Sequence, residues 1–591
     1  MKRPKLILIL IAALWACFAM SSIMLIVQIS TKPSGSVGPQ GTQGVQGDPG
    51  ERGSLWFSGS GAPTASNPSN PKSGDFYIDL DSMNIYKYNG TAWVASGSLK
   101  GEDGNSGEDG NDGNRGSIWF RGTAEPANGT TADDVKEGDF YFLYFEDTSL
   151  LNGYRIYRYS DERWNLLVDL ATARNISEAS EFSVKTSTEF EAIAKLVNEG
   201  ETFQGKTITL ADDIDLNGDE WVPIGSKAGS SAASIPFSGT FDGNNKTISN
   251  MTIYSSGKTE DGEGDVPIKY YAGFFGALKN ATVKDLTISG ASVGVSPQYE
   301  SGTRNVAPQY SGVFAGRIDG GTVSNVRIVD SNVRVSQHGG IFAAEAWTGK
   351  IIDCEIIGST MTGSTGAFIG GFSGQGYATY ENCTVDGCTI QGGMKTGGIV
   401  GQFDEGSGGM KNVTVKNTTI QLMTNYAGGM LVGLLNYGSR LFEDCKVENC
   451  TISEERNQKT SMYDVGGFIG KIIGRNGNVV TFKNCQVDGI TFKNYVSVKN
   501  VGGFVGGQQS SENYKFTLSF EGCSVSGLRV TSDSDEITYV GAFVGRLDGV
   551  GANLTISFEG NDNYYSDCGD YELVGDSTHV VSGAENVTKK S

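Results

Sequence analysis

Apolar and polar positions recur in a fixed order from about residue 182 to the end of the chain. One recurring motif is Gly-(Gly/Ala)-apolar-apolar-Gly, as in "GGIVG" at Gly397–Gly401. Its copies end at Gly276, Gly370, Gly401, Gly470, Gly506 and Gly545, with close relatives at Gly316 and Gly433 and a decayed copy at Ala344. The copies follow one another every 26 to 40 residues. This spacing predicts one structural unit per copy.

A nine-residue motif follows each of the first eight copies. Its occurrences are Asn280–Ile288, Asn325–Val333, Asp353–Met361, Asn382–Ile390, Asn412–Ile420, Asp444–Ile452, Asn484–Phe492 and Gly522–Val530. Positions two, four and nine are mainly apolar, whereas position six is Asp, Asn or Gly, the residues that tolerate a left-handed backbone. The pattern predicts a strand, a turn and a second short strand in every copy.

Stacking these units in parallel would bury each apolar position as a ladder. We therefore predict an all-β fold whose main domain is a right-handed parallel β-helix, a solenoid. The first position of the motif would form a ladder of stacked asparagines at one corner. Its members would be Asn280, Asn325, Asn382, Asn412 and Asn484, with Asp353 and Asp444 as variants.

Cysteines occupy two positions of the nine-residue motif. Position two holds Cys354, Cys383, Cys445, Cys485 and Cys523, and position seven holds Cys388 and Cys450. Other copies place Ala281, Val326 and Val413 at position two and Leu286, Thr418 and Ile490 at position seven, so we interpret these cysteines as small buried apolar residues with free thiols. Disulfides between adjacent turns, such as Cys354–Cys383 or Cys485–Cys523, remain an alternative. The spacing contains no CxxC pair, which argues against zinc.

An amphipathic helix is predicted just before the repeats. Phe190, Ile193, Leu196 and Val197 share one face, and Gly200 would end the helix. Thr188 and Glu191 have the spacing of a capping box. Such a helix would cover the first turn of the solenoid and prevent other strands from pairing with its open end.

The glycine motif resembles the GLUG motif of bacterial surface proteins. The segments "EFSVKTSTEFEAIAKLVNEGETFQGKTITLADDIDLNGDEWVPIGS" and "FSGTFDGNNKTISNMTI" are similar to the usual opening of such β-helical domains. The resemblance covers about residues 182–560, and it implies adhesion or display without naming a ligand. GLUG repeats also occur beside the zinc peptidase of immunoglobulin A-cleaving enzymes. This chain lacks the HExxH helix of those enzymes, so we do not expect that activity.

Two short segments before the repeats have glycine at every third residue. The glycines are Gly35, Gly38, Gly41, Gly44, Gly47, Gly50 and Gly53, and then Gly101, Gly104, Gly107, Gly110, Gly113 and Gly116. Only glycine fits the axis of a collagen triple helix, so this period is similar to that of bacterial collagen-like surface proteins. It predicts a homotrimeric stalk, and a solvated extended linker is the alternative.

Each glycine-triplet segment is followed by the same small module. Trp56 matches Trp119, Gly74 matches Gly138, Tyr86 matches Tyr157 and Trp93 matches Trp164. Alternating aromatic residues predict small antiparallel β units. We interpret the aromatics as a core; a platform for sugar rings is the alternative.

The N-terminus reads "MKRPKLILILIAALWACFAMSSIMLIVQIS". Three cations precede an apolar run from Leu6 to about Ile29, which is long enough to span a bilayer. The cations favour a cytoplasmic N-terminus with the rest of the chain outside, as a single-pass anchor in the cell membrane. A lipoprotein modified at Cys17 and an ordinary cleaved signal peptide are alternatives that also export the chain.

The charge balance restricts the partners. The 591 residues carry 46 Lys+Arg against 67 Asp+Glu, a formal net charge of −21. Such a chain is repelled by nucleic acid and by anionic membrane surfaces. The chain has 84 glycines, so turns are expected to be frequent. It has only two histidines, which leaves few residues for histidine-based metal binding or acid–base catalysis.

Few residues suggest chemistry of their own. The densest acidic cluster is Asp212, Asp213, Asp215, Asp219 and Glu220. Within it, Asp213, Asp215 and Asn217 have the first half of a calcium-loop pattern, but Ile224 replaces the acidic twelfth residue. Calcium is thus the single cofactor candidate, against a solvated turn. His338 is a candidate general base at a strand edge.

We expect a non-enzymatic adhesin or display protein on the cell surface. The alternative is a polysaccharide lyase or hydrolase, which would need carboxylates from separate turns in one groove. No catalytic residue is assigned. Contacts with an extracellular protein or glycan are expected from the loops Ser255–Tyr270, Ser292–Tyr310, Glu454–Asp464 and Gln508–Lys515, with the candidate binding residues Tyr270, Tyr299, Tyr310, Tyr463 and Tyr514.

The expected domain boundaries follow from these patterns. They are the membrane anchor 1–30, a collagen-like segment 31–53, a first β module 54–98, a collagen-like segment 99–116, a second β module 117–170, a linker with the capping helix 171–200, the parallel β-helix 201–570 and a C-terminal tail 571–591.

Overall fold

The computed structural model describes most of the chain after residue 53. The described residues are 54–64, 68–99, 117–123, 126, 135–144, 151–152, 154–169, 172–173, 179–225, 235–254, 271–295, 307–423, 426–454, 462–475, 477–494, 497–509, 516–532, 536–548, 554–576 and 580–590. The chain divides into two compact units, Met1–Gly101 and Glu102–Ser591, and each is treated by itself.

Several predicted segments fall outside these residues. They include the membrane anchor 1–30, the collagen-like segment 31–53 and, apart from Leu99, the segment 99–116. Among the residues that are described, no helix is both long and apolar enough to cross a bilayer. The anchor and the stalk therefore stay predictions from the sequence.

The two β modules have the same topology. In the first, β1 (Trp56–Gly59), β2 (Phe76–Asp79), β3 (Asn84–Tyr88) and β4 (Trp93–Ser98) lie in the order β1-β2-β3-β4. In the second, β5 (Trp119–Gly122), β6 (Phe140–Tyr144), β8 (Tyr154–Ser160) and β9 (Arg163–Asp169) lie in the order β5-β6-β8-β9. The first pair of each sheet is parallel and the other two pairs are antiparallel, so the predicted antiparallel pairing is confirmed for two of the three pairs, and the parallel first pair was not predicted.

Their aromatic residues form two matching cores. Trp93 lies 5.2 Å from Tyr88, 5.7 Å from Tyr77 and 6.2 Å from Phe57, measured between ring centroids. In the second module, Trp164 has the same three kinds of neighbour, with centroid distances of 5.2 Å to Tyr159, 5.7 Å to Tyr141 and 5.9 Å to Phe120. These rings pack on one another, as expected if they form the core of each module.

A buried aspartate fixes the start of each module. Asp75 accepts hydrogen bonds from the N–H groups of Leu55 (2.8 Å) and Lys72 (2.7 Å). Asp139 does the same for Ile118 and Lys136, both at 2.8 Å. Charge-assisted hydrogen bonds of this kind compensate the cost of burying a carboxylate. They explain why the Gly-Asp-Phe-Tyr sequence appears in both modules.

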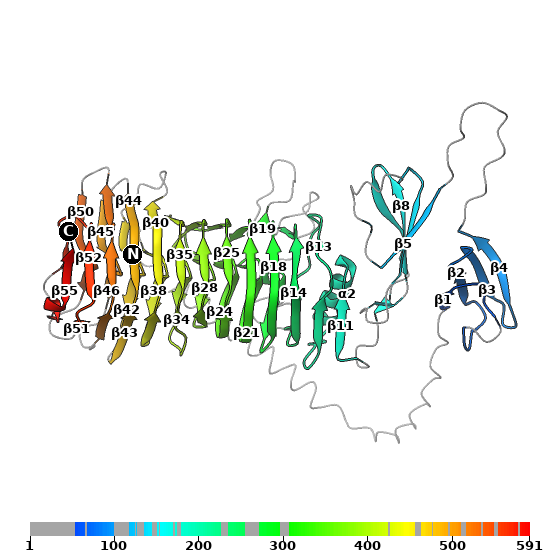
Figure 1. The fold of residues 1–591 in the computed structure, drawn as a ribbon, viewed down its shortest axis with the longest axis horizontal. Helices are drawn as coiled ribbons and strands as arrows, with labels where there is room; N and C mark the ends of the chain where they lie inside the picture. Colours follow the sequence, from blue (N-terminus) through cyan, green and yellow to red (C-terminus); the bar gives the residue numbers. More distant parts are fainter. Residues whose placement is uncertain are drawn as a thin grey trace, which may run out of the picture. The chain divides into compact units, whose positions relative to one another are not determined.

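The strands from β11 (Glu181–Val184) onward form one long parallel solenoid (Figure 1). One turn runs through β27 (Phe368–Gly370), β28 (Ser373–Gly376), β29 (Thr379–Glu381), β30 (Thr384–Asp386) and β31 (Thr389–Gly392). The next strand, β32 (Lys395–Gly397), then pairs in parallel with β27. All strand pairs of this sheet in the described residues are parallel, so the predicted all-β fold with a parallel β-helix is confirmed.

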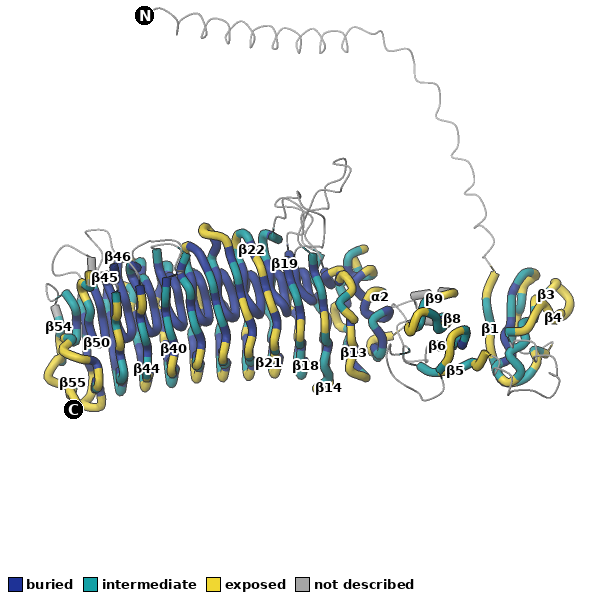
Figure 2. The backbone as a smooth tube through the Cα atoms, turned by 90° about the horizontal axis from the view of Figure 1, so that it is seen from above, coloured by how far each residue is buried: buried dark blue, intermediate teal, exposed yellow. Residues whose placement is uncertain are grey.

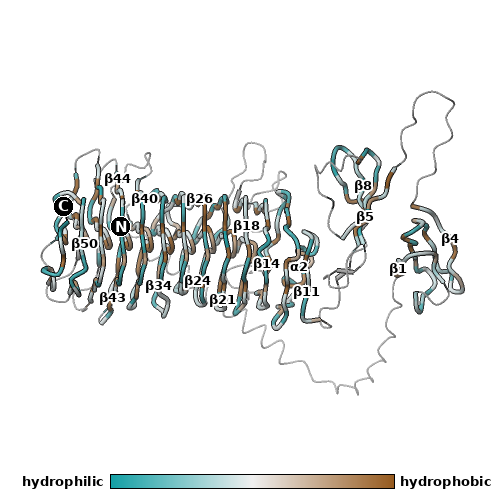
Figure 3. Tube along the Cα trace, in the orientation of Figure 1, coloured by the Kyte–Doolittle hydropathy of each residue, from teal (hydrophilic) through white to brown (hydrophobic). Residues whose placement is uncertain are grey.

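The core runs along the inside of the solenoid, as the buried positions in Figure 2 show. Figure 3 shows hydrophobic and hydrophilic residues mixed along the strands, which follows from side chains alternating between inside and outside. Equivalent side chains of successive turns stack. Phe442, Phe482, Phe520 and Phe558 do so with centroid distances of 5.2, 5.0 and 5.2 Å.

The first turn is covered by the helix α2 (Ser187–Asn198), which follows β11 (Glu181–Val184). Phe190, Ile193 and Val197 are buried, as predicted. The predicted capping box was wrong by two residues, because Thr186 caps the helix and pairs with Glu189. The solenoid also starts earlier than residue 201, because β11 pairs with β12 (Thr207–Leu210).

The first nine-residue motif was assigned in the wrong register. Leu286 pairs with Val326, Ile288 with Ile328 and Val293 with Val333, so residues 285–293 stack on Asn325–Val333. The sequence comparison started this copy at Asn280, five residues too early. Both segments begin with a polar residue followed by apolar residues at positions two and four, so the pattern alone does not separate them.

Two corners of each turn use a left-handed backbone. Position six was predicted to do so, and its φ angles lie between 47° and 70° at Gly290, Asp330, Gly358, Gly387, Asn417, Asn449, Gly489 and Gly527. The first position does so as well, which was not predicted; examples are Asp285 (56°) and Asn412 (50°). The short polar side chains of Asn and Asp tolerate this conformation because they hydrogen-bond locally.

The predicted asparagine ladder is present, with Asp285 in the place of Asn280. Asn325 Nδ2 donates to Asp285 Oδ1 at 2.7 Å, and Asn382 Nδ2 donates to Asp353 Oδ1 at 2.8 Å. Two further bonds join Asn412 to Asn382 (2.9 Å) and Asn484 to Asp444 (3.2 Å). In these four pairs the asparagine of one turn donates to the Asn or Asp of the previous turn.

The glycine motif forms a corner at which backbones come very close together. A Cβ atom on Gly401 would lie 2.5 Å from the N atom of Ile369 and 2.6 Å from the O atom of Gly374, both in the preceding turn. A Cβ atom on Gly397 would lie 2.0 Å from the O atom of Val400. There is therefore no room for a side chain at these positions of the corner, and glycine is required. The two residues that flank the motif face each other across the corner.

The C-terminal residues belong to the solenoid. β53 (Glu572–Val574), β54 (Val580–Ser582) and β55 (Val587–Lys590) pair with β50 (Glu536–Asp548), β51 (Leu554–Glu559) and β52 (Asn563–Ser566). The predicted tail 571–591 was therefore wrong. No copy of the glycine motif marks this turn, which is why the sequence pattern missed it.

Candidate functional site

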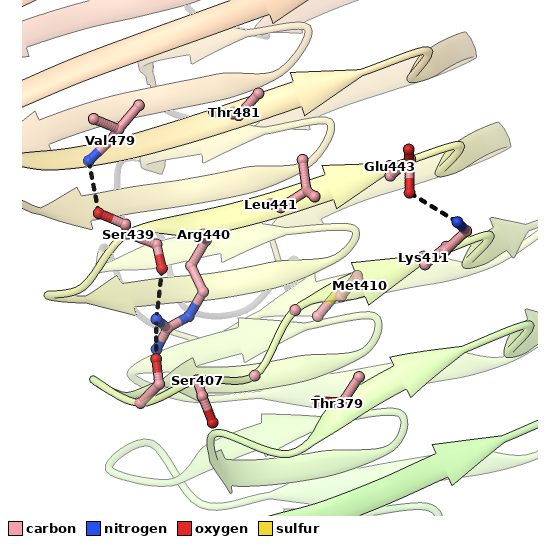
Figure 4. Close-up of a pocket in the computed structure, with 13 residues that line it drawn as sticks. Thr379, Ser407, Met410, Lys411, Ser439, Arg440, Leu441, Glu443, Val479 and Thr481 are labelled. Atoms are coloured by element: carbon pink, nitrogen blue, oxygen red, sulfur yellow. Dashed lines mark hydrogen bonds and ion pairs between the residues drawn. The ribbon is translucent and has the colours of Figure 1, made fainter.

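A trough of about 600 Å³ lies on the outer wall of the solenoid (Figure 4). Its floor comes from β29, β34 (Met410–Lys411), β39 (Arg440–Glu443) and β43 (Asn478–Lys483). It is lined by Thr379, Gly406, Ser407, Gly408, Gly409, Met410, Lys411, Ser439, Arg440, Leu441, Glu443, Val479 and Thr481.

A short insertion creates the trough. The chain takes six residues, 404–409, to pass from β33 (Val400–Phe403) to β34, whereas the preceding turn takes only two, 377–378, from β28 to β29. Gly408 and Gly409 carry no side chains, and this leaves the floor low between Thr379 and Leu441. The inserted loop and the glycine floor together hollow the wall.

Arg440 holds the inserted loop in place. Its side chain is 3% exposed, and it donates hydrogen bonds to the carbonyl oxygens of Gly406 (2.7 Å), Ser439 (2.8 Å) and Asp404. Its guanidinium lies 4.8 Å from the centre of the Phe403 ring, a cation–π contact. Burial lowers the pKa of Arg440, but a guanidinium stays protonated in proteins.

Loops of successive turns contact the inserted loop next to the trough. Arg475 pairs with Glu405 of the inserted loop at 2.9 Å, and its guanidinium lies 3.7 Å from the centre of the Tyr437 ring. Asn478 accepts a hydrogen bond from the N–H group of Arg475 at 2.9 Å. On the other side, Lys411 and Glu443 form an ion pair at 2.9 Å, which raises the pKa of Lys411.

The lining combines hydroxyl groups with two exposed apolar side chains. Thr379, Ser407, Ser439 and Thr481 supply hydroxyls, and Leu441 is 46% exposed beside Val479. Glu443 is the single carboxylate among the lining residues, and it is already paired. A glycosidase needs two carboxylates across the scissile bond. The trough therefore suits hydrogen bonding and apolar contact with a neutral ligand.

A second polar feature follows the glycine corner, and we call it the polar seam. It consists of the flanking residues seven positions apart: Tyr310 and Arg317, His338 and Glu345, Lys395 and Gln402, Asp464 and Lys471. His338 Nδ1 lies 3.0 Å from Glu345 Oε1, and Lys471 Nζ lies 3.0 Å from Asp464 Oδ2. Burial lowers the pKa of Lys395 to about 8.

His338, the candidate general base, lies in this seam. Its ring stacks on Phe368 with a centroid distance of 4.8 Å and meets the edge of Tyr310 at 5.1 Å. Its partner Glu345 is buried and also accepts hydrogen bonds from Trp347 (3.0 Å), Arg317 (3.1 Å) and Tyr271 (3.2 Å). These donors keep the pKa of Glu345 below its usual value despite burial. A carboxylate held by four donors has its lone pairs occupied.

Of the five predicted tyrosines, the structure describes Tyr310 and Tyr463. Tyr270, Tyr299 and Tyr514 lie outside the described residues. Tyr310 is half-buried and packs against Tyr271 with a centroid distance of 4.9 Å. Tyr463 is also half-buried, with Lys499 Nζ 5.5 Å from the centre of its ring. The two described tyrosines thus pack within the wall, and the trough was not predicted.

The acidic residues of the predicted calcium site accept local hydrogen bonds. Asp213 Oδ1 accepts from the N–H group of Thr247 at 2.7 Å, and Asp215 Oδ1 accepts from the N–H group of Asn217 and from Asn250 Nδ2, both at 2.8 Å. In the part of the chain that the structure describes, no three acidic, cysteine or histidine side chains are grouped so as to hold a metal ion.

The cysteines lie in the interior, as predicted. Eight are described, and all are buried and unbridged: Cys354, Cys383, Cys388, Cys445, Cys450, Cys485, Cys523 and Cys568. Their thiols donate to backbone carbonyls; for example, Cys445 Sγ lies 3.3 Å from the O atom of Glu443 and 3.5 Å from that of Met410. Burial raises the pKa of Cys388 and of Cys450 to about 11.

Comparison with known proteins adds little to this geometry. No protein-family model and no curated protein matches the chain. Among solved structures, the chain is similar to a protein from Bacteroides ovatus described as a candidate immunoglobulin A1 protease. The likeness has 17% sequence identity and a TM-score of 0.29, and it covers 62% of this chain and 84% of the other. At that level it carries no argument about activity.

Proposed function

We propose that the chain is a membrane-anchored protein of the cell surface that binds an extracellular ligand through the wall of a right-handed β-helix. The observation that carries this proposal is the trough, whose loop is fixed by Arg440, whose lining is rich in hydroxyls and whose Lys411 and Glu443 are already paired with each other. Pockets of this size hold ligands when a few polar groups fix the orientation and apolar groups add contact area. The ligand it suits is uncharged and extended, either a glycan chain or a peptide segment.

The anchored topology rests on the sequence. The apolar run after Lys2, Arg3 and Lys5 would place the N-terminus in the cytoplasm and the solenoid outside. The resemblance to GLUG-motif surface proteins supports the same placement. The net charge of −21 suits a surface protein that stays soluble by self-repulsion.

Polysaccharide cleavage has less support than binding. A hydrolase would need one carboxylate as acid and a second as base or nucleophile. The trough contributes Glu443 alone, and in the polar seam Glu345 is occupied by four donors. We therefore favour a binding protein.

The test is ligand binding by the full chain in detergent, probed on arrays of neutral glycans and of extracellular proteins. The trough variant is Leu441→Arg, which would fill the trough with a charged side chain. The control is Val222→Arg, because Val222 is also an exposed apolar residue, but of the first solenoid turns. We expect the trough variant to lose at least about 10-fold in affinity, while the control binds as the wild type does.

Two results would count against the proposal. One is that the wild-type chain retains no neutral ligand on either array. The other is that Leu441→Arg binds the ligand as tightly as the wild type, which would place binding elsewhere on the wall.

A further inference from the structure

Exposed apolar side chains are concentrated on the two β modules. Of the eleven exposed large apolar residues in the described part of the chain, six lie there: Leu55, Val94, Ile118, Tyr144, Leu166 and Leu167. The solenoid is several times longer but carries only the other five. The exposed apolar residues are therefore several times denser on the modules than on the solenoid.

Five of these six residues lie at the edges of the small sheets, and the sixth, Tyr144, ends the inner strand β6. Leu55 (46% exposed) immediately precedes β1, and Ile118 (38% exposed) immediately precedes β5 at the matching position of the second module. The opposite edges are β4 and β9, because the sheet orders are β1-β2-β3-β4 and β5-β6-β8-β9. β4 carries Val94, and β9 carries Leu166 and Leu167.

An edge strand with exposed apolar side chains favours association with another chain. Two different apolar edges on one sheet allow a head-to-tail contact, in which the first edge of one copy meets the last edge of the next. Such contacts close into a ring when the rotation permits it. The partner that fits both edges is therefore another copy of the same module.

The sequence before each module indicates how many copies meet. Leu55 follows Gly53 by two residues, and Ile118 follows Gly116 by two residues. Both glycines are the last of a series with a period of three, the period that brings three chains to a common axis. Two extended residues span at most about 7 Å. The side chains of Leu55 and Ile118 would then lie close to that axis in all three chains.

We propose that both modules are trimerisation units of this chain. Three copies of Leu55, and three of Ile118, pack around the axis of the glycine-triplet segments, and the edges β4 and β9 pack against the neighbouring copy. A triple helix of the glycine-triplet segments would hold three modules together and so raise their local concentration. This inference does not depend on ligand binding at the trough.

The test counts chains in the full-length protein by native mass spectrometry from detergent at micromolar concentration. We expect three chains for the wild type. The variants Leu55→Glu with Ile118→Glu, and Leu166→Glu with Leu167→Glu, should raise the concentration at which the trimer dissociates by at least about 10-fold. The control, Val222→Glu with Leu441→Glu, adds two charges at exposed apolar positions of the solenoid and should leave the trimer unchanged.

A milder pair, Leu55→Ser with Ile118→Ser, separates loss of contact from loss of folding. Tryptophan fluorescence reports whether Trp93 and Trp164 remain packed in their cores, and the serine pair should keep that signal while weakening the trimer. The proposal is overturned if the wild type is monomeric or dimeric. It is equally overturned if the folded module variants dissociate at the same concentration as the control.

Discussion

At the scale of single residues, the buried cysteines show how position in a ladder determines chemistry. Cys445 occupies a position that holds valine in two other turns, Val326 and Val413. We expect Cys445→Val to change the free energy of unfolding by less than about 1.5 kcal/mol, because the swap is similar in volume and apolar. Cys445→Asp should be severe, because it places an unpaired carboxylate between two turns. Urea denaturation monitored by circular dichroism measures both.

Thiol labelling provides an independent check of the same position. Buried thiols should not react with a maleimide in the native protein at pH 8 and should react fully in urea. Rapid native labelling of Cys445, or a large loss of stability on adding a reductant to the unmodified protein, would contradict the ladder.

The raised pKa values also predict a loss of stability in alkali. Burial raises the pKa of Cys450 to about 11, from about 9 for the same thiol in the unfolded chain. A group whose pKa is raised by folding stabilises the native state below the unfolded value, and this contribution is lost as the pH rises through the folded value. Relative to Cys450→Ala, the wild type should lose about 2 kcal/mol between pH 8 and pH 11. Equal pH profiles for the two proteins would rule this out.

Residue types alone predicted much of the interior, but not the trough. Each apolar position recurs from copy to copy, so stacking follows directly from the sequence. The trough instead depends on an insertion of a few residues after Phe403 and on a buried cation, Arg440, that binds backbone carbonyls. Backbone carbonyls have no sequence signature. The insertion would have become visible only by aligning Tyr380, Met410 and Phe442 as equivalent positions.

At the scale of structural elements, the glycine corner is the part of each turn that leaves the least room for a side chain. Gly401→Ala should destabilise the solenoid by about 1–3 kcal/mol, because the new methyl group meets backbone atoms of the preceding turn that cannot move aside. Gly366→Ala is the matched control, since a Cβ atom there meets nothing within 4 Å. It should be neutral, within about 0.5 kcal/mol. Thermal unfolding compares them, and equal midpoints would mean that the corner has more room than its geometry indicates.

The helix α2 offers a second test at this scale. Its first turn is held by Thr186, which accepts from the N–H group of Glu189 at 3.3 Å, while Glu189 accepts from the N–H group of Thr186 at 3.2 Å. Thr186→Ala should cost about 1 kcal/mol, and Thr186→Ser, which keeps the acceptor, should cost less. Unfolding in urea ranks the two variants. A serine variant as unstable as the alanine variant would indicate that the threonine methyl group, and not the cap, matters.

At the scale of the whole molecule, the position of the anchor predicts which parts a protease can reach. The cations before the apolar run 6–29 favour a cytoplasmic N-terminus, so nearly all of the chain would be outside the cell. Protease added to intact cells that have a single accessible membrane should remove an epitope tag at the C-terminus and spare one at the N-terminus. Protection of the C-terminal tag in intact cells, and its loss after lysis, would refute this topology.

The charge of the whole chain predicts how salt acts on its assembly. Each copy carries a net charge of −21, so three copies repel one another at low ionic strength. The contacts proposed between modules are apolar, and salt does not screen them as it screens charges. Raising the salt from about 50 mM to about 500 mM shortens the distance over which like charges repel to a few ångströms. The dissociation concentration of the trimer should therefore fall, as measured by analytical ultracentrifugation with density-matched detergent. If salt instead loosens the trimer, ion pairs hold it together, and the exposed apolar edges of the modules would not be its interface.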